Sequence, residues 1–400
     1  MTLTGPQPAN RNLVVSALGV TQILAWGSSY YLLAVLAPAI VADTGWLLAW
    51  VVGGLSLGLL VAGAASPFIG RLIQQRGGRP VLCASSVLIA LGLIVLSIST
   101  TRTIYIAGWL VTGLGMGAGL YDAAFGTLGR LYGTGARRAI TNLTLFGGFA
   151  STVCWPLSAF LVETYGWRNT CLVYAGIQLA VCLPIHALVI PRTVPPLAPK
   201  PDGEAGNTAS YGAMFVLLAL ILSLTAMTTS LMSVHLLTLL KARGFELATA
   251  VALGALVGPS QVGARLVEWS FGPRYHPMWT MLGAVTLLAC GISVLLLAPQ
   301  LALVALIIYG GGNGISSIAR GTLPLALFGA GNYAAMMGKL ALPALISQAA
   351  APSIGALLIE FGGAQLTMLV LAVVTLANCA IALVLARIVW RPAKTAATSL

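Results

Sequence analysis

Twelve long blocks of apolar residues dominate this chain of 400 residues. A helix of about 20 apolar residues spans the roughly 30 Å hydrocarbon core of a bilayer. Hydrophobic residues make up 58% of the sequence and charged residues only 7%, whereas soluble proteins carry roughly 25% charged residues. This composition excludes a soluble enzyme, a disordered chain and a nucleic-acid-binding domain. The apolar runs are continuous and do not alternate, which excludes an outer-membrane barrel. We therefore expect an all-α membrane protein with twelve transmembrane helices.

The twelve blocks fall into two sets of six. They cover about 13–39, 47–72, 80–100, 104–129, 139–162 and 168–190, and then 212–240, 247–270, 278–298, 301–328, 333–359 and 365–388. The stretch between the sets is rich in Pro, Gly, Asp and Lys, which is typical of a linker. We expect an N-terminal six-helix bundle at 1–192, a cytoplasmic linker at 193–210 and a C-terminal six-helix bundle at 211–400.

The two halves also share short patterns. Residues 117–129 and 312–324 both contain Gly-x-Gly and Gly-Thr-Leu, at a constant offset of 195 residues. Residues 70–72 and 263–266 repeat a Gly-Arg-Leu-like pattern at nearly the same offset. A duplicated six-helix unit predicts two pseudo-symmetric bundles, with the substrate site at their interface.

Basic residues are distributed unevenly between the two predicted faces. With twelve helices both termini lie on one face, and fifteen of the 20 Lys and Arg residues fall there, against four on the other face. Because basic loops stay in the cytoplasm, we expect both termini to be cytoplasmic, in a bacterial-type inner membrane. The formal net charge of +12 then meets anionic lipid headgroups of the bilayer, and no nucleic-acid partner is expected.

The loop between the second and third blocks carries a recognisable signature. It matches the pattern G-x-L-x-D-R-x-G-x-R at Gly70, Leu72, Gly77 and Arg79, with Gln74 in the place of the Asp. In this the chain resembles the major facilitator superfamily over essentially its whole length. The resemblance implies a transporter fold with two six-helix bundles, and it assigns Gly70, Gly77 and Arg79 to a gating loop. The family's Asp locks the cytoplasmic gate, a role that Gln74 cannot fill with a charge.

Within that superfamily the chain loosely resembles the bacterial monocarboxylate and oxalate transporters. In those proteins an Arg on the eighth helix binds the substrate carboxylate, and Arg265 fits that position. Gln261 stands where the monocarboxylate carriers place an Asp. The resemblance thus implies substrate-binding roles for Arg265 and Gln261. An alternative is that Arg265 anchors a helix end or a gate, paired with Glu268 three residues further on.

Two ionisable residues lie deep inside apolar blocks, where a charge costs at least about 2.5 kcal/mol. Asp122 lies eight residues before Arg130, which is about 12 Å along a helix, and Arg320 lies at a similar depth in the tenth block. The repeat offset places them one turn apart, so they can face each other across a cavity. We expect Arg320 to bind an anionic group and Asp122 to carry the coupling proton. The alternative is an ion pair that only holds helices together.

Other polar or aromatic side chains are weaker candidates for the substrate site. On the first helix Trp26, Tyr30 and Tyr31 follow one another at spacings near four, and they serve either a ligand or ordinary packing. Asn313 on the tenth helix and His235 on the seventh add polar atoms to the list. Elsewhere, Pro156, Pro259 and Pro324 are expected to interrupt helices, and glycines are expected to let helices approach closely. The glycines concerned are Gly54, Gly58, Gly63, Gly113, Gly117 and Gly119.

The chain shows no sequence signs of an enzyme. Its six cysteines lie in apolar runs without a C-x-x-C, and it contains neither H-E-x-x-H nor a Walker motif. We expect no metal, no cofactor and no catalytic residue. The predicted function is secondary active transport of a small organic anion, a mono- or dicarboxylate, by a proton-coupled monomer through alternating access. Efflux of a toxic compound, a non-transporting membrane sensor and a membrane-embedded enzyme are the alternatives.

Overall fold

A computed structural model of the protein describes residues 10–192 and 208–390, which form helices joined by short turns, without a β-strand. The N-terminal half contains α1 (Arg11–Gly27), α2 (Leu32–Thr44), α3 (Leu48–Arg76), α4 (Gly78–Ser97), α5 (Arg102–Gly119), α6 (Tyr121–Tyr132), the turn η1 (Gly133–Gly135), α7 (Ala136–Gly147), α8 (Ala150–Ile177), the π-turn η2 (Gln178–Cys182) and α9 (Leu183–Val189). The C-terminal half contains α10 (Thr208–Ala242), α11 (Leu247–Ala255), α12 (Val257–Phe271), the turn η4 (Gly272–Arg274), α13 (Pro277–Leu297), the turn η5 (Pro299–Leu301), α14 (Ala302–Phe328) and α15 (Tyr333–Val389).

The helices cross the molecule twelve times. Among the described residues, nine continuous helical stretches are long and apolar enough to span a membrane. Two of them turn sharply at glycines with positive φ, a backbone conformation that favours glycine. Gly133 and Gly166 divide residues 102–189 into three spans, and Gly363 divides residues 333–389 into two. The prediction of an all-α protein with twelve transmembrane helices is therefore confirmed.

The helix boundaries differ from the predicted ones in places that have physical reasons. α11 ends at Ala255 because Pro259 has no N–H to donate to the Ala255 carbonyl one turn earlier. The expected interruptions at Pro156 and Pro324 are wrong, since α8 and α14 continue through them. α10 already begins at residue 208, inside the predicted linker, and the rest of that linker lies outside the described residues.

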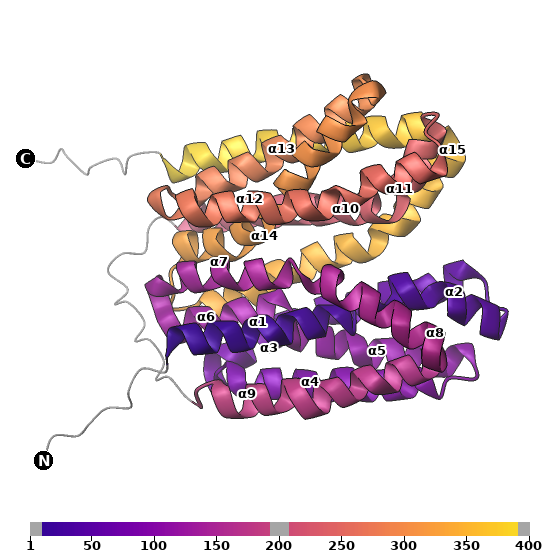
Figure 1. The fold of residues 1–400 in the computed structure, drawn as a ribbon. Helices are drawn as coiled ribbons and strands as arrows, with labels where there is room; N and C mark the ends of the chain where they lie inside the picture. The colour runs from indigo at the N-terminus through magenta and orange to yellow at the C-terminus, as the bar shows by residue number, and fades with distance from the viewer. Residues whose placement is uncertain (1–9, 193–207, 391–400) are drawn as a thin grey trace, which may run out of the picture.

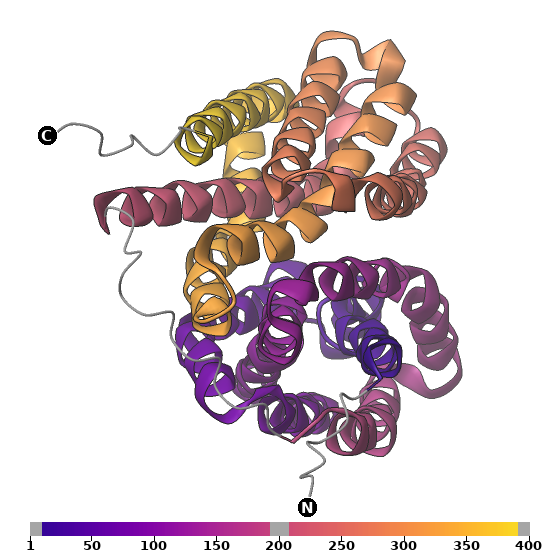
Figure 2. The same cartoon turned by 90° about the vertical axis from the view of Figure 1, so that its left-hand side faces the viewer.

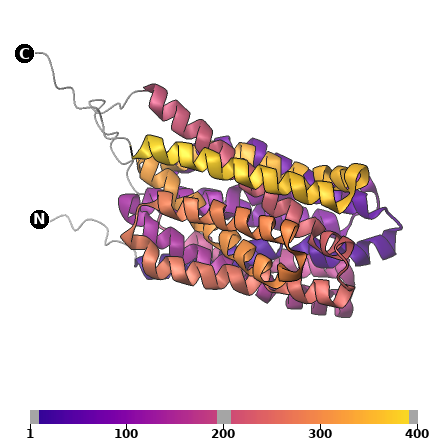
Figure 3. The same ribbon diagram turned by 90° about the horizontal axis from the view of Figure 1, so that it is seen from above.

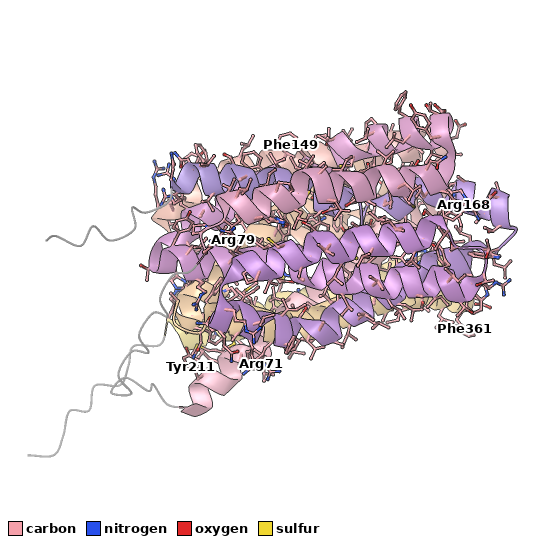
Figure 4. All side chains as sticks on the ribbon, turned by 90° about the horizontal axis from the view of Figure 1, so that it is seen from below. Arg71, Arg79, Phe149, Arg168, Tyr211 and Phe361 are labelled. Atoms are coloured by element: carbon pink, nitrogen blue, oxygen red, sulfur yellow. The ribbon has the colours of Figure 1, made fainter. Side chains whose placement is uncertain are left out.

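The two halves form separate bodies of roughly parallel helices. In Figure 1 the N-terminal half, indigo to magenta, lies below the C-terminal half, pink to yellow. Figure 2 looks along the helices and shows the N-terminal half as a ring, and Figure 3 shows the helices running side by side from above. α1 begins, and α9 and α15 end, at the same end of the molecule, which we call the terminal end. Figure 4 places Arg71, Arg79 and Tyr211 at the terminal end, and Arg168 and Phe361 at the opposite end.

The halves are packed together toward the terminal end. One buried cluster combines Phe125 and Leu128 of α6 with Tyr333 and Met337 of α15, so it belongs to both halves. Toward the opposite end, the buried cluster of α2, α4 and α8 contains N-terminal residues alone, and the cluster around α11 and α13 contains C-terminal residues alone. Apolar packing between the halves therefore covers the terminal end and extends to the middle of α3, where Leu59 and Ala62 form a buried cluster with Ala349 of α15.

Glycines allow the closest of these approaches. A Cβ added to Gly113 of α5 would lie 2.2 Å from the Gly58 carbonyl of α3, so these two glycines allow the close approach of helices that was predicted for them. The same holds between the halves, where a Cβ on Gly338 of α15 would lie 2.3 Å from the Ser66 carbonyl and one on Gly70 would lie 2.5 Å from the Ala334 carbonyl. Backbone therefore packs directly on backbone where α3 crosses α15.

Substitution of Gly338 by valine should push α3 and α15 apart. Overpacking typically costs about 1–3 kcal/mol, and here the obstacle is backbone, which cannot rotate away. We expect a clearly lower midpoint in thermal unfolding of the purified protein. Gly53→Val is the control, because Gly53 lies on α3, the other helix of this contact, and a Cβ there meets nothing within 4 Å. Equal midpoints for the two variants would contradict the close approach.

Candidate functional site

The fourth span breaks beside a predicted site residue. α5 ends at Gly119 and α6 begins at Tyr121, with Leu120 extended between them (φ −79°, ψ −168°). The break leaves the Gly119 carbonyl without its helical partner, and Gln22 of α1, which is fully buried, donates to it through Nε2 at 2.6 Å. Asp122 consequently lies in the first turn of α6, where the positive end of the helix dipole stabilises a carboxylate.

Asp122 meets Arg320 across the interface of the two halves. Arg320 Nε donates to Asp122 Oδ1 at 2.9 Å, and Arg320 Nη2 donates to Asp122 Oδ2 at 2.6 Å. The Arg320 and Asp122 side chains are 21% and 16% exposed. A two-pronged, charge-assisted contact of this kind is among the strongest polar contacts in proteins. The predicted approach of the two residues is thus observed, and Arg320 already has a counter-charge.

Arg265 of α12 is more deeply buried and has no such counter-charge. Its side chain donates to four oxygens, which are the Gly314 carbonyl at 3.0 Å, the Thr144 carbonyl at 3.0 Å, Ser317 Oγ at 3.3 Å and Gln261 Oε1 at 3.4 Å. The residue is only 5% exposed. All four acceptors are neutral, and no carboxylate of the described residues is bonded to it. The arrangement satisfies the N–H groups of Arg265 and leaves its positive charge uncompensated.

The predicted pairing of Arg265 with Glu268 is wrong. Glu268 Oε1 accepts a hydrogen bond from Thr280 Oγ1 of α13, at 2.7 Å. Arg265 instead extends between α14 and α7, where the oxygens of Gly314 and Thr144 hold it. Neighbours in the other helices therefore override the spacing of three residues, and the interpretation of Arg265 as a paired helix-end anchor is not supported.

The remaining polar candidates divide into two groups. Gln261 belongs to the Arg265 cluster through its Oε1, and Asn313 is half-buried on α14, one turn before Ser317. His235 lies elsewhere, because its Nε2 contacts the Pro352 carbonyl at 2.9 Å, between α10 and α15. The structure thus brings Gln261 and Arg265 together, with Asn313 on the adjoining helix, and it turns His235 toward the backbone of α15.

The aromatic candidates lie next to this cluster, on the N-terminal half. The Trp26 ring lies 5.5 Å from Tyr30, 5.8 Å from Tyr31 and 5.2 Å from Tyr121 of α6, measured between ring centroids. Tyr31 in turn lies 6.0 Å from Trp155 of α8. A Cβ added to Gly147 would lie 2.0 Å from the Tyr121 hydroxyl, and one on Gly148 would lie 2.5 Å from Arg265 Nη1, so Tyr121 and the guanidinium reach adjacent residues at the end of α7.

Sequence analysis did not single out Tyr121, Trp155 or Ser317 as candidates. Tyr121 precedes Asp122 and stacks on Phe125 one turn later, with ring centroids 5.1 Å apart. Two aromatic residues four positions apart, and therefore on one face of the helix, were the available signal. Nothing in the sequence marks Trp155, because its role depends on how α8 rotates against its neighbours. The repeat offset of 195 residues relates Ser317 to Asp122, but it does not predict the contact of Ser317 with Arg265.

The residues of the predicted gating loop lie at the terminal end. Gly70 contacts α15, Gly77 has a φ of +84° between α3 and α4, and Arg79 Nη1 donates to the Ile190 carbonyl at 3.5 Å. Gln74 Nε2 donates to the Gly331 carbonyl of the other half at 2.7 Å. A neutral hydrogen bond therefore joins the halves at the position where the signature has an Asp.

Within the described ranges, no group of three or more His, Cys, Asp or Glu side chains is placed to hold a metal ion. The six cysteines are free thiols, and three of them are buried.

A hollow of about 200 Å³ occurs at the terminal end, between η1, α7 and the end of α12. Its lining residues include Arg137, Arg138 and Trp269.

Comparison with known proteins agrees with this architecture. The sequence profile of the Major Facilitator Superfamily matches residues 18–338. Human monocarboxylate transporter 11 is 30% identical over 256 residues, which cover 61% of this chain and 52% of that protein. Rat monocarboxylate transporter 13 is 26% identical over 247 residues, covering 58% and 56%. The matched region thus spans little more than half the length of these relatives.

Solved structures share the fold at low sequence identity. The crystal structure of the human organic anion transporter MFSD10 (TETRAN) has a TM-score of 0.74 at 15% identity, covering 94% of this chain and 100% of that one. The superfamily transporter FucP in its outward conformation has a TM-score of 0.72 at 13% identity, covering 93% and 98%. Since the family profile matches most of the chain and the twelve-helix fold agrees, this protein belongs to the Major Facilitator Superfamily of transporters.

Proposed function

We propose that the protein is a proton-coupled secondary transporter of a small organic anion, a mono- or dicarboxylate, that works by alternating access. The observation that carries this proposal is the buried Arg265 guanidinium, whose four acceptors are all neutral. A buried charge without a counter-ion is costly. A carboxylate is the group that would remove that cost and accept two parallel hydrogen bonds from the guanidinium.

Arg265 is a better substrate ligand than Arg320 in this state. Asp122 already neutralises Arg320, whereas nothing neutralises Arg265 among the described residues. The two arginines are connected, because Ser317, which accepts from Arg265, precedes Arg320 by one turn of α14. A carboxylate that binds Arg265 therefore arrives beside the Asp122–Arg320 pair. The names of the relatives, monocarboxylate transporters and an organic anion transporter, support an anionic substrate.

The Asp122–Arg320 pair supplies the coupling step. Its partners come from α6 and α14, which belong to different halves. Protonation of Asp122 removes the negative charge that holds Arg320 and releases Arg320 for the substrate carboxylate. Proton and anion then replace one internal ion pair, and the halves lose a strong contact at the terminal end. This exchange links substrate binding to the separation of the halves.

The orientation follows from the distribution of the arginines. Arg71 and Arg79 lie at the terminal end (Figure 4), together with Arg11, Arg130 and Arg138. We infer that the terminal end faces the cytoplasm and that the protein lies in a bacterial-type inner membrane. The state described here is then closed toward the cytoplasm, and the substrate enters from the opposite side.

Replacing Arg265 by Gln should abolish stabilisation by carboxylates. A ligand that binds the native state raises its apparent stability with ln(1 + [L]/Kd), and removing one partner of a buried charge pair costs about 2–5 kcal/mol. We expect at least one of acetate, lactate and oxalate, each tested alone, to raise the unfolding temperature of the wild type. Arg265→Gln should bind that anion at least about 30-fold more weakly.

Arg138→Gln is the matched control, because Arg138 is exposed and contributes nothing to the site. Retained carboxylate stabilisation in Arg265→Gln would contradict the proposed role of Arg265. Stabilisation of the wild type by neutral or cationic solutes alone would contradict the proposed substrate class and favour efflux of such compounds.

Replacing Asp122 by Asn should separate substrate exchange from proton movement. In liposomes loaded with a pH-sensitive dye, a carboxylate gradient should drive protons through the wild type. Asp122→Asn should still exchange labelled substrate for unlabelled substrate, because Asn cannot titrate but Arg265 remains. Proton movement should fall to the background of empty liposomes.

Asp43→Asn is the control, since Asp43 also pairs with an arginine, Arg168, but at the opposite end and outside the site. If Asp122→Asn moved protons as fast as the wild type, the Asp122–Arg320 pair would be a purely structural contact. If the single variant does not fold because Arg320 is left unpaired, the double variant Asp122→Asn/Arg320→Gln removes both charges and takes its place.

A further inference from the structure

The site has two chemically different walls. The wall from the N-terminal half consists of the rings of Trp26, Tyr30, Tyr31, Tyr121 and Trp155, which we call the aromatic wall. Each ring lies within 6.0 Å of another ring of the wall, between centroids. The wall from the C-terminal half is polar and cationic, and its residues are Gln261, Arg265, Asn313, Ser317 and Arg320.

The aromatic wall faces the other half. Tyr30 packs against the buried cluster that joins Leu59, Ala62 and Met116 to Ala349 of α15. Tyr121 and Arg265 reach neighbouring positions, because a Cβ added to Gly147 would lie 2.0 Å from the Tyr121 hydroxyl and one on Gly148 would lie 2.5 Å from Arg265 Nη1. Aromatic residues also form belts at the surface of a bilayer, but these approaches place the rings next to α12 and α15 of the opposite half.

The aromatic wall also has unused binding capacity. Trp155 leaves 46% of its surface exposed beside Tyr31. The Trp26 Nε1–H is buried without a hydrogen-bond partner among the described residues, as is Gln22 Oε1 one turn earlier on α1. An unpaired buried polar group carries a desolvation cost that a ligand can remove. An aliphatic ligand group has no aromatic ring to pack against these rings and no acceptor for this N–H.

We propose that the preferred substrates are aromatic carboxylates, with the ring against the aromatic wall and the carboxylate on Arg265. This inference rests on the proposed function, because it uses the same site and the same carboxylate ligand. Aromatic rings attract each other in edge-to-face and offset arrangements beyond what their buried area provides. The wall presents such faces and edges, since Trp26 and Tyr30 meet at 80° and Tyr31 and Trp155 at 87°. A hydroxyl on the substrate ring would pair with Trp26 Nε1.

The experiment compares four probes on the purified full-length protein by thermal stabilisation. Benzoate has ring and charge, cyclohexanecarboxylate has the same number of carbons without the aromatic ring, acetate has the charge alone, and benzyl alcohol has the ring without the charge. We expect benzoate to bind about tenfold more tightly than either of the other carboxylates, and benzyl alcohol not to stabilise. In Trp155→Leu the affinity for benzoate should fall about fivefold and that for acetate should not change.

Trp279→Leu is the matched control, because Trp279 is 57% exposed and its ring lies 4.8 Å from that of Trp390, away from the site. Equal binding of benzoate and cyclohexanecarboxylate, or tighter binding of acetate, would overturn the inference and leave the carboxylate transporter standing. Binding of none of the three carboxylates would overturn the proposed function as well. An equal loss of benzoate affinity in Trp155→Leu and Trp279→Leu would show that the wall does not hold the ring.

Discussion

Two opposite charges inside membrane-spanning helices lower each other's cost when they are in contact, and here they come from different halves of the chain. Asp122 and Arg320 must therefore keep α6 and α14 together for as long as both are ionised. The surroundings support this contact. The break at Leu120 places the Asp122 carboxylate at a helix start. Tyr333 fixes α14 by donating to the Gly321 carbonyl at 2.6 Å. The pair thus joins the halves deep in the molecule, beside the apolar cluster of α6 and α15.

The other polar contacts between the halves are of a different kind. Gln74 donates to the Gly331 carbonyl, Arg137 Nη2 to the Gly272 carbonyl at 2.6 Å, Trp269 Nε1 to Asn142 Oδ1 at 2.8 Å, and Arg265 Nη1 to the Thr144 carbonyl at 3.0 Å. None of these acceptors titrates, and each such hydrogen bond contributes only about 0.5–1.5 kcal/mol, or somewhat more for the two charged donors. They can be exchanged for water one by one as the halves separate. Among the hydrogen bonds described across this interface, the contact with Arg320 is the one whose acceptor, the Asp122 carboxylate, can be protonated.

Different parts of this arrangement were accessible from the sequence to different degrees. Apolar blocks of about 20 residues predict spans because the bilayer fixes their length, and counting along a helix gives Asp122 and Arg320 a common depth. Rotation of a helix about its axis is not encoded in the same way. Which neighbours Arg265 reaches depends on α7 and α14, so the rule for residues three apart predicted Glu268 wrongly. Trp155 was not predicted as a site residue for the same reason. The expectation that proline interrupts a helix was right for the break before Pro259 and wrong at Pro324.

The internal repeat gives a reason for the uncompensated charge of Arg265. The offset of 195 residues relates Asp122 of the fourth span to Ser317 of the tenth. Each of these positions accepts a hydrogen bond from an arginine, Asp122 from Arg320 and Ser317 from Arg265. Both equivalent positions thus accept from an arginine, Asp122 from the other half and Ser317 from its own half, but only Asp122 supplies a negative charge. A duplicated unit with a carboxylate in both positions would have two closed ion pairs and no attraction for an anion. With serine in the second position, the unit retains one ion pair and one arginine without a counter-charge, which is the combination that the proposed anion transport uses.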